Sequence, residues 1–260
     1  MGVWSSYENR ITSHGSSKRE AMLKRELHML GEDLPDTLSY HTATIDGNEY
    51  EVAIADSDNL NEKTIYSMAS GIITGGEIVE WMNNKWLVVE CDANSEIYTR
   101  AKLKQCNYLL KWIDSDSVIH EQWCIIEDGT KYLTGEYEDR NFVVTRGDSR
   151  IAMTISRNAD TVKFGREHRF LIDDPDSLEK LAYLLTKPLK LGAVYNNRGV
   201  YSFVLQEVVS TDDDNHELGI ADYYKYFEKK TNPDSATDES DEKDEKDDSS
   251  SREDGKKVWL

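Results

Sequence analysis

The chain has 260 residues, of which 38% are hydrophobic and 31% charged, and its formal net charge is −19. The acidic excess is not confined to one end, because residues 228–260 contribute −5 and residues 1–227 carry the remaining −14. A protein that binds nucleic acid or an anionic membrane surface by itself needs a basic surface. The composition therefore argues against both of these classes.

The three cysteines, Cys91, Cys106 and Cys124, are odd in number and form no CxxC pair. Two of them lie in apolar, strand-like runs, where a free cysteine behaves as a small hydrophobic residue. We therefore expect buried, reduced thiols. The N-terminus has no apolar signal segment, and no window approaches the roughly 20 apolar residues of a membrane span. We expect a protein that is made and used in a cytoplasm unless an assembly carries it out.

Residues 1–37 are predicted to be helical. The spacing of a capping box, in which a hydroxyl and a glutamate bond the first free amides, occurs at Ser5 and again at Ser17. Gly15 and Gly31 are placed to end the two helices. The sequence thus predicts an N-terminal segment of two short helices.

The second of these helices is amphipathic and has a basic face. Its apolar stripe consists of Leu23, Leu27 and Leu30. Its basic side chains are Lys18, Arg19, Lys24 and Arg25. Such a face is either solvated and paired with nearby glutamates, or a docking surface for an acidic partner. A DNA-reading helix-turn-helix also fits the helical pattern, but the acidic flanking sequence disfavours it.

From Leu38 to about Ser210 the signals are mostly those of β-structure. Turn residues that tolerate positive φ recur between pairs of β-prone runs, which is typical of hairpins. The predicted turns are Asp46-Gly47, Asn83-Asn84, Asp128-Gly129, Arg146–Asp148 and Asn196–Gly199. Strands joined by turns rather than by helices predict a mainly β protein with an antiparallel barrel or sandwich core. No internal repeat of fixed period is visible.

The stretch from Gly75 to Ile113 is predicted to be a β-meander. After the hairpin at Asn83-Asn84, a longer run resumes at Tyr98 and places alternate apolar residues on one face. These residues are Cys106, Tyr108, Leu110 and Trp112. We interpret the tryptophans of this stretch as core residues of a barrel rather than as ligand anchors.

Two further segments are assigned from their composition. A short helix is predicted near Pro175–Leu185, because Leu178, Leu181 and Leu185 recur at helical spacing. The polar segment Asp56–Lys63 is predicted to be an exposed loop. Together with the N-terminal helices, the region from Asp56 to Gly76 is a candidate contact surface.

The predicted organisation has three parts: a helical segment over 1–37, a β-rich core over 38–228 that comprises one or two β subdomains, and a tail over 229–260. Residues 231–257 are highly charged and contain no aromatic or β-branched aliphatic residue. Such a segment buries too little apolar surface to offset the entropy of ordering, so we expect disorder. The tail ends in Val258, Trp259 and Leu260, which are either without a role or a short docking motif on a flexible arm.

No motif indicates catalysis, a cofactor or a metal. Neither GxSxG nor a phosphate- or dinucleotide-binding glycine pattern occurs. His120 and Cys124 lie in a predicted strand, about 13 Å apart along one face and too far apart to share a metal. The run from Asp212 to Glu217 lacks the glycine and glutamate spacing of a calcium loop and is predicted to be an acidic hairpin loop.

Several ordered blocks resemble virion structural proteins of tailed bacteriophages that are encoded in the head–tail connector region. The blocks are VWSSYENRI, NLNEKTIYS followed by GGEIVEW, YTRAKLKQCNYLLKW, RFLIDDPDS, GVYSFVLQEV and ELGIADYYKYF. They span roughly residues 3–227, and none of them is a chemical signature. The acidic tail falls outside the pattern.

The resemblance implies a non-enzymatic, head-closure or stopper-like subunit of the virion neck, synthesised in the host bacterial cytoplasm. It implies a small β-barrel fold and a homo-oligomeric ring, expected to be a hexamer, between a portal or adaptor protein and the tail. Packaged DNA would pass through the channel without sequence-specific binding, which suits an acidic subunit. No cofactor, metal or membrane is expected.

Contact residues within this interpretation are proposed from the basic face of the second helix, the polar segment around Asn59 and the apolar end of the tail. They are Lys18, Arg19, Lys24, Arg25, Asp58, Asn59, Asn61, Val258, Trp259 and Leu260. Two alternatives stay open at this point. One is another tail or baseplate component, and the other is a carbohydrate-binding or carbohydrate-active β-protein that uses the tryptophans at 81, 86, 112 and 123.

Overall fold

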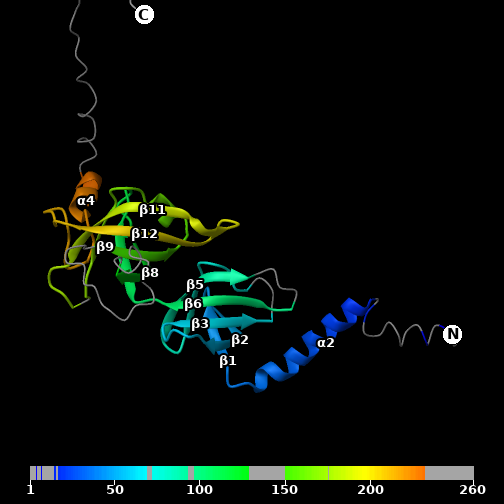
Figure 1. The fold of residues 1–260 in the computed structure, drawn as a ribbon. Helices are drawn as coiled ribbons and strands as arrows, with labels where there is room; N and C mark the ends of the chain where they lie inside the picture. Colours follow the sequence, from blue (N-terminus) through cyan, green and yellow to red (C-terminus); the bar gives the residue numbers. More distant parts are fainter. Residues whose placement is uncertain are drawn as a thin grey trace, which may run out of the picture.

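The computed structural model describes residues 17–68, 72–92, 97–128, 150–174 and 176–231, together with Trp4, Tyr7 and Gly15. Within these residues the protein is mainly β, as predicted, and its strands form two antiparallel six-stranded sheets. Figure 1 shows the two sheets side by side, with a single long helix reaching away from them. The predicted β-barrel core is therefore confirmed.

The first sheet closes on itself as a barrel in the order β1-β2-β3-β6-β5-β4. Its strands are β1 (Tyr40–Ile45), β2 (Asn48–Asp56), β3 (Glu62–Ser67), β4 (Ile78–Trp81), β5 (Asn84–Asp92) and β6 (Thr99–Gln105). Two residue pairs between β1 and β4, Thr44 with Glu80 and Ile45 with Val79, complete the ring. We call this unit the first barrel.

The second sheet has the order β10-β11-β12-β9-β8-β7. Its strands are β7 (Tyr108–Ile113), β8 (Ile119–Asp128), β9 (Arg150–Ser156), β10 (Arg169–Ile172), β11 (Leu181–Tyr195) and β12 (Arg198–Val208). Its outer strands, β7 and β10, also approach each other, and the Tyr108 hydroxyl donates a hydrogen bond of 3.2 Å to the Leu171 carbonyl. We call this barrel-like unit the second barrel.

The two barrels have the same strand order. Counted from its own first strand, each runs 1-2-3-6-5-4, so three strands form a meander and the fourth crosses to the far side of the first. The connection that makes this crossing follows the third strand in both units. The second crossing contains the short 3-10 helix η2 (Thr161–Lys163). One folding plan is therefore used twice, although the sequence shows no repeat.

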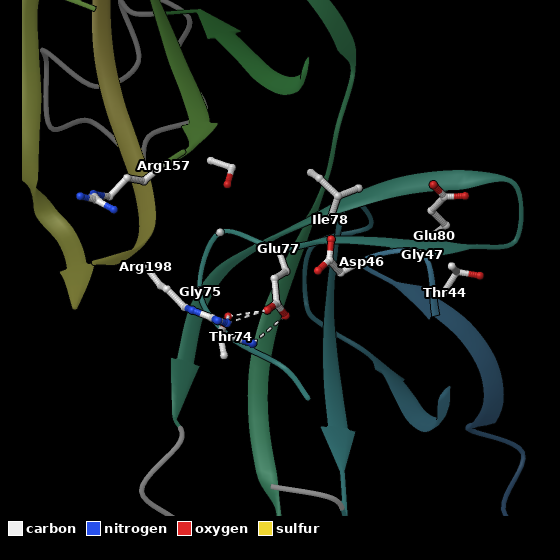
Figure 2. Close-up of a pocket in the computed structure, with 12 residues that line it drawn as sticks. Thr44, Asp46, Gly47, Thr74, Gly75, Glu77, Ile78, Glu80, Arg157 and Arg198 are labelled. Atoms are coloured by element: carbon white, nitrogen blue, oxygen red, sulfur yellow. Dashed lines mark hydrogen bonds and ion pairs between the residues drawn. The ribbon is translucent and has the colours of Figure 1, made fainter. Parts of the chain in front are cut away.

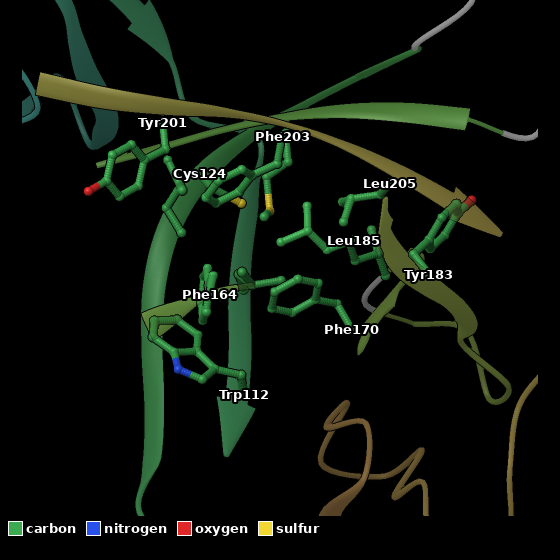
Figure 3. Packing of buried hydrophobic residues seen from close by; sticks show 13 residues of the cluster. Trp112, Cys124, Phe164, Phe170, Tyr183, Leu185, Tyr201, Phe203 and Leu205 are labelled. Carbon is green, nitrogen blue, oxygen red and sulfur yellow. The ribbon is translucent and has the colours of Figure 1, made fainter. Parts of the chain in front are cut away.

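Each barrel has its own hydrophobic core. The first is mainly aliphatic and includes Ile45, Val52, Ile65, Val79 and Leu103, each at most 1% exposed. The second is rich in aromatic rings, and Figure 3 shows Phe164 and Phe170 at its centre beside Trp112. The Phe164 ring lies edge-on to Trp112 and Phe170, with centroid distances of 5.0 and 5.1 Å, which is a favourable geometry for aromatic pairs.

In the described part of the chain, helices α2 and α4 flank the barrels. Helix α2 (Lys18–Asp33) precedes the 3-10 helix η1 (Leu34–Asp36) and begins at the predicted cap, where the Ser17 hydroxyl accepts a hydrogen bond from the Glu20 amide at 3.2 Å. Helix α4 (Tyr223–Thr231) follows the last strand and was not predicted. It contacts the second barrel through the Ser117 hydroxyl, which donates to the Tyr226 carbonyl at 2.7 Å.

The helix predicted near Pro175–Leu185 is wrong. The chain there contains strand β11 from Leu181 onward, and Leu178 before it is 92% exposed. A spacing of four residues between Leu181 and Leu185 also fits a strand, because every second side chain of a strand shares a face. Pairing with β10 decides between the two, since Leu181 lies opposite Ile172.

The predicted end of the second N-terminal helix at Gly31 is also wrong. Helix α2 continues to Asp33, because a glycine inside a helix costs only about 1 kcal/mol. The helix ends where Pro35 cannot donate the hydrogen bond that the next turn requires. The first predicted helix lies outside the described residues except for Trp4 and Tyr7, which are both helical.

The predicted meander from Gly75 to Ile113 needs two corrections. The first turn consists of Met82 and Asn83, which both have positive φ, rather than Asn83-Asn84. The run after Tyr98 is not one strand, because the chain passes from one barrel to the other at Cys106. The Cys106 amide still bonds the first barrel at the Lys85 carbonyl (2.9 Å), whereas β7 pairs with β8 and with no other described strand.

The polar segment predicted as a loop over Asp56–Lys63 is shorter in the structure. Asp56 ends β2 and Lys63 lies in β3 directly opposite it, where the two side chains form an ion pair. The exposed loop is residues 57–61. Strand β3 also occupies part of the region from Asp56 to Gly76 that was predicted as a contact loop.

Other predicted turns have mixed outcomes. The hairpin at Asp46-Gly47 is confirmed, with φ of 50° and 78°, and the hairpin after β11 is confirmed with a two-residue turn at Asn196-Asn197. The predicted turns at Asp128-Gly129 and Arg146–Asp148 fall on or beside residues 129–149, which lie outside the described part.

Candidate interaction surfaces

The two barrels are joined by a very short connection and an apolar contact. Only Cys106 and Asn107 separate β6 from β7. Leu87 of β5, Cys106, Ile125 of β8 and Val200 of β12 are buried together between the barrels. Lys104 of β6 also forms a 2.6 Å ion pair with Glu127 of β8. A tether of two residues with a packed interface favours one rigid body rather than two independent domains.

A second contact connects the tip of the β11–β12 hairpin to the first barrel (Figure 2). The Arg198 guanidinium donates to the Thr74 hydroxyl at 2.8 Å and to a Glu77 carboxylate oxygen at 3.1 Å. Glu77 also accepts hydrogen bonds from the Thr74 hydroxyl (2.6 Å) and amide (2.9 Å). The Glu77 carboxylate is thus fully engaged in holding the hairpin tip.

Glycines allow the backbones to meet at this contact. A Cβ atom added to Gly76 would lie 2.1 Å from the Gly199 carbonyl oxygen, and one added to Gly199 would lie 2.0 Å from the Ala193 carbonyl oxygen. Gly76 has φ +87° and Gly199 φ +134°, which other residues rarely adopt. Space and backbone conformation therefore both require glycine at these two positions.

An open cavity of about 490 Å³ lies beside the hairpin tip, between the barrels. Carboxylates from the first barrel (Asp46, Glu77 and Glu80) and guanidinium groups from the second (Arg157 and Arg198) line it. Arg198 and Glu77 pair across the junction, whereas Glu80 pairs with Lys85 of its own barrel and Arg157 donates to the Asn197 carbonyl. These pairs favour a structural contact between the barrels as the role of the charges. No group of three or more His, Cys, Asp or Glu side chains in the described part of the chain could hold a metal ion.

A second hollow, of about 440 Å³, is more apolar, and we call it the inter-barrel groove. It runs between β5 and β6 of the first barrel and β9, β11 and β12 of the second. Its apolar lining includes Val89, Leu103, Leu189, Ala193 and Val204. Its charged lining consists of Glu62, Glu90, Lys102, Lys104, Glu127 and Lys187. An apolar floor with a charged rim is the composition of a protein contact site.

A buried ionic cluster fixes the segment after β12. Arg169 of β10 donates to both carboxylate oxygens of Asp214, at 3.0 and 2.7 Å, and to Asp222 at 2.7 Å. Burial would raise the pKa of Asp214, but bonds from the Thr211 and Asp222 amides and from Arg169 outweigh it, so the pKa lies below its ordinary value. The acidic loop predicted at 212–217 is therefore a structural clasp.

His120 does not join Cys124 in a metal site. Its Nε2 lies 3.1 Å from Asp114 and its Nδ1 lies 3.3 Å from Asp160, while Trp112 stacks on its ring. Burial opposes ionisation of Asp114, but hydrogen bonds from the Val118 amide and from His120 lower its pKa to about 2. The group is a charged network that holds the 114–118 turn.

All three cysteines are free thiols, as predicted. Cys106 and Cys124 are buried and Cys91 is half-buried. Burial raises the pKa of the Cys106 thiol to about 12 and also raises the pKa values of Cys91 and Cys124. Because the thiolate is the reactive form, these positions are poor nucleophiles at neutral pH.

We therefore expect the native protein to react slowly with a disulfide reagent at pH 8, and all three thiols to react rapidly in urea. Absorbance of the released thiol, with mass spectrometry of the labelled peptides, measures both. Cys91 should be labelled first. Rapid labelling of Cys106 in the native protein would contradict the assigned burial.

The predicted contact residues lie at separate places. Lys18, Arg19, Lys24 and Arg25 are exposed on α2, and Asp58, Asn59 and Asn61 are exposed in the loop of residues 57–61. Val258, Trp259 and Leu260 lie outside the described residues. The structure does not bring the first two sets together, so each would serve a different contact.

The tryptophans do not form a shared platform. Trp86 is buried in the first barrel and Trp112 in the second. Trp81 is half-buried 6.0 Å from the Trp86 ring centroid, and Trp123 is half-buried at the junction. The interpretation of Trp86 and Trp112 as barrel core agrees with this placement. The carbohydrate alternative depended on a shared surface of tryptophan rings, which these four residues do not form.

Sequence reasoning missed the two charged contacts that organise this surface. Arg198 and Glu77 are 121 positions apart, and Arg169 and Asp214 are 45 apart. No local periodicity reports such pairs. The available signals were the adjacent glycines Gly75-Gly76, which mark close backbone approach, and an arginine at the start of an apolar strand.

Comparison with known proteins finds a family match for the first part of the chain. Residues 13–105 match a family described as the YomX N-terminal domain. The match ends at Gln105, the last residue of β6, so it covers α2 and the whole first barrel. No curated protein and no solved structure is significantly similar to the chain.

The matched domain is phage-derived, which supports a phage structural protein and agrees at that level with the resemblance drawn from the sequence. The second barrel lies outside the match. None of the described helices is long and apolar enough to cross a membrane.

Proposed function

We propose that this protein is a non-enzymatic structural subunit of a phage neck, and specifically a head-closure subunit between a portal or adaptor protein and the tail. The observation that carries the proposal is the pair of packed barrels, of which the first, with α2, matches a phage-derived domain. Among the described residues, no group of three or more His, Cys, Asp or Glu side chains could hold a metal ion, and Arg198 in the cavity beside the hairpin tip is paired with Glu77. A stiff scaffold with outward-facing loops and a free helix suits a part that joins neighbours.

In this proposal the subunits form a homo-oligomeric ring, a hexamer, through which packaged DNA passes without sequence-specific binding. The net charge of −19 supports this role, because an acidic channel wall attracts phosphates weakly and lets the duplex slide. The exposed loop of residues 57–61 and α2 are contact candidates, and the Val258–Leu260 triplet is a further candidate for a tail-borne contact.

Position in the virion tests the neck assignment. A short epitope inserted between Leu178 and Glu179, which are both exposed and lie outside the contact candidates, should leave both barrels intact. Gold-labelled antibody on purified virions should then mark the junction of head and tail. A label at the tail tip would assign the chain to the baseplate instead, and particles without the protein would exclude a virion component.

Loss of the gene tests head closure within the neck. A non-permissive host infected with a nonsense mutant should yield separate tails and heads that have lost DNA, and plasmid-borne wild-type protein should restore joined particles. DNA-filled heads that carry incomplete tails would contradict closure and favour a tail component. Electron microscopy and nuclease protection of the packaged genome measure these outcomes.

A further inference from the structure

Helix α2 has an apolar stripe that packs against neither barrel in the described part of the chain. Leu23, Leu27, Leu30 and Leu34 follow one another at spacings of four, three and four residues, so they share one face. Every residue of α2 is exposed or half-buried. Figure 1 shows the helix pointing away from both barrels, and η1 is the element of the described chain that it contacts most.

A helix of 16 residues is marginally stable alone in water, and the charges of this one help it only in part. Glu20 lies in the first turn and pairs with Lys24 one turn later, but most of the other charges are placed unfavourably. Its first half carries Lys18, Arg19, Lys24 and Arg25, and its last turn contains Glu32 and Asp33. This order opposes the helix dipole, which favours acidic residues at the start and basic residues at the end. Contact with another surface is therefore the expected source of its stability.

The inter-barrel groove is the complementary surface. Leu189 is 47% exposed at its edge, and Val89, Ala193 and Val204 are half-buried along it. Its volume of about 440 Å³ accommodates several aliphatic side chains. Apolar side chains at i, i+4 and i+7 of a helix are the pattern that grooves of this kind recognise.

The charges beside the stripe match those beside the groove. Lys24 and Glu26 flank the leucines on opposite edges of α2. Glu62 of the first barrel and Lys187 of the second barrel both line the groove, and neither forms an ion pair with another described residue. Among the described residues, the ion pair of Lys24 is an exposed one with Glu20, which is readily exchanged. Placing Lys24 toward Glu62 and Glu26 toward Lys187 gives one orientation of the helix.

We propose that α2 of one copy docks in the inter-barrel groove of a second copy. Donor helix and acceptor groove are different surfaces of one chain, so the contact is heterologous and can repeat from copy to copy until a ring closes. This proposal deepens the ring within the proposed function by naming the surfaces that hold it together.

Sedimentation velocity of the full-length protein over a range of concentrations tests the contact. The wild type should self-associate, and Leu27→Asp should raise the apparent dissociation constant at least about tenfold, because a buried anchor becomes charged. Met29→Glu is the matched control, since Met29 is 44% exposed on another face of the same helix, and should change association little. A wild type that stays monomeric, or equal effects of the two variants, would overturn the proposal.

Mixing separates this contact from a pairing of two α2 helices. Leu27→Asp lacks a working helix and Ala193→Glu lacks a working groove, so each alone should be monomeric. An equimolar mixture should form a dimer, because one copy keeps the helix and the other keeps the groove. Absence of that dimer, with wild-type association intact, would overturn a heterologous contact.

A charge exchange fixes the orientation. Glu26→Lys and Lys187→Glu should each weaken association about threefold to tenfold, and the double variant should recover most of the loss. No recovery in the double variant would overturn the assigned orientation. The virion label remains an independent test of the neck assignment. If the label marks the neck but the protein is monomeric in solution, only the helix–groove contact is rejected. If the protein self-associates as expected but the label lies elsewhere in the virion, only the neck assignment is rejected.

Discussion

Replacing Arg169 by methionine is expected to lower the free energy of unfolding by about 3–5 kcal/mol, because it leaves buried carboxylates without their counter-charge. The Asp214 side chain is fully buried, and Asp222 shares the same guanidinium. Urea unfolding followed by tryptophan fluorescence measures the loss. Methionine keeps much of the arginine's apolar length, so the change reports chiefly on charge and hydrogen bonds.

Arg166→Met is the matched control, because Arg166 is exposed on the same segment and forms no ion pair with another described residue. It should change stability by no more than about 0.5 kcal/mol. A double-mutant cycle of Arg169→Met with Asp214→Asn should be strongly non-additive, since both changes remove one interaction. An Arg169→Met variant within about 1 kcal/mol of the wild type would contradict the clasp.

The clasp also predicts how acid affects stability. The pKa of Asp214 is lower in the folded protein than its ordinary value, so this carboxylate stabilises the fold above about pH 4. Its contribution is lost as the pH falls through the lowered folded value. The stability difference between wild type and Arg169→Met should therefore shrink in acid. A constant difference from pH 7 to pH 3 would exclude Asp214 as the linked group.

Local turn chemistry accounts for the part of the fold that the sequence predicts well. Asp46-Gly47 and Asn196-Asn197 supply the positive φ that tight hairpins need, whatever the surrounding fold. Where a pattern fits two structures, the sequence alone does not decide. Leu181 and Leu185 lie on one face of either a helix or a strand, and only pairing with β10 selects the strand.

The point at which the chain passes from the first barrel to the second was not predicted, for a different reason. The run through Cys106 and Tyr108 keeps an apolar alternation, so it resembles one long strand. Asn107 breaks it: its side chain donates to the Ile126 carbonyl at 2.7 Å and accepts from the Ile126 amide at 2.8 Å. An amide side chain that pairs like backbone becomes apparent only when the partner strand is known.

The shared strand order of the barrels could not be predicted from residues either. Any pattern that alternates apolar side chains and supplies turns at suitable points satisfies the same plan, so the two units need no common residues. The charge pattern of the second N-terminal helix correctly predicted a surface element, because all four basic residues of α2 are exposed. The inter-barrel groove, which we propose receives α2 of another copy, is assembled from strands up to about 140 positions apart in the sequence. It therefore has no local sequence signature.

The second large effect on stability is expected at the junction between the barrels. Gly76→Ala is expected to destabilise the junction by at least about 3 kcal/mol, because a positive φ in a non-glycine residue costs about 1–3 kcal/mol and the new Cβ overlaps the Gly199 carbonyl. Because that oxygen is a backbone atom of the hairpin tip, it cannot move away without displacing the hairpin. Each barrel keeps its own core, so the variant should loosen the pair before either barrel unfolds.

Gly47→Ala separates the two causes. Gly47 also has positive φ, +78°, but a Cβ there would meet nothing within 4 Å, so this variant should lose only about 1 kcal/mol. Urea unfolding and limited proteolysis of the Cys106-Asn107 connection measure both variants. If Gly76→Ala splits a single transition into two and exposes the connection while Gly47→Ala does neither, the barrels are coupled through the hairpin tip. Equal behaviour of the two variants would mean that the hairpin tip does not couple the barrels, and that the connection, the apolar cluster around Leu87 and the Lys104–Glu127 pair hold them together.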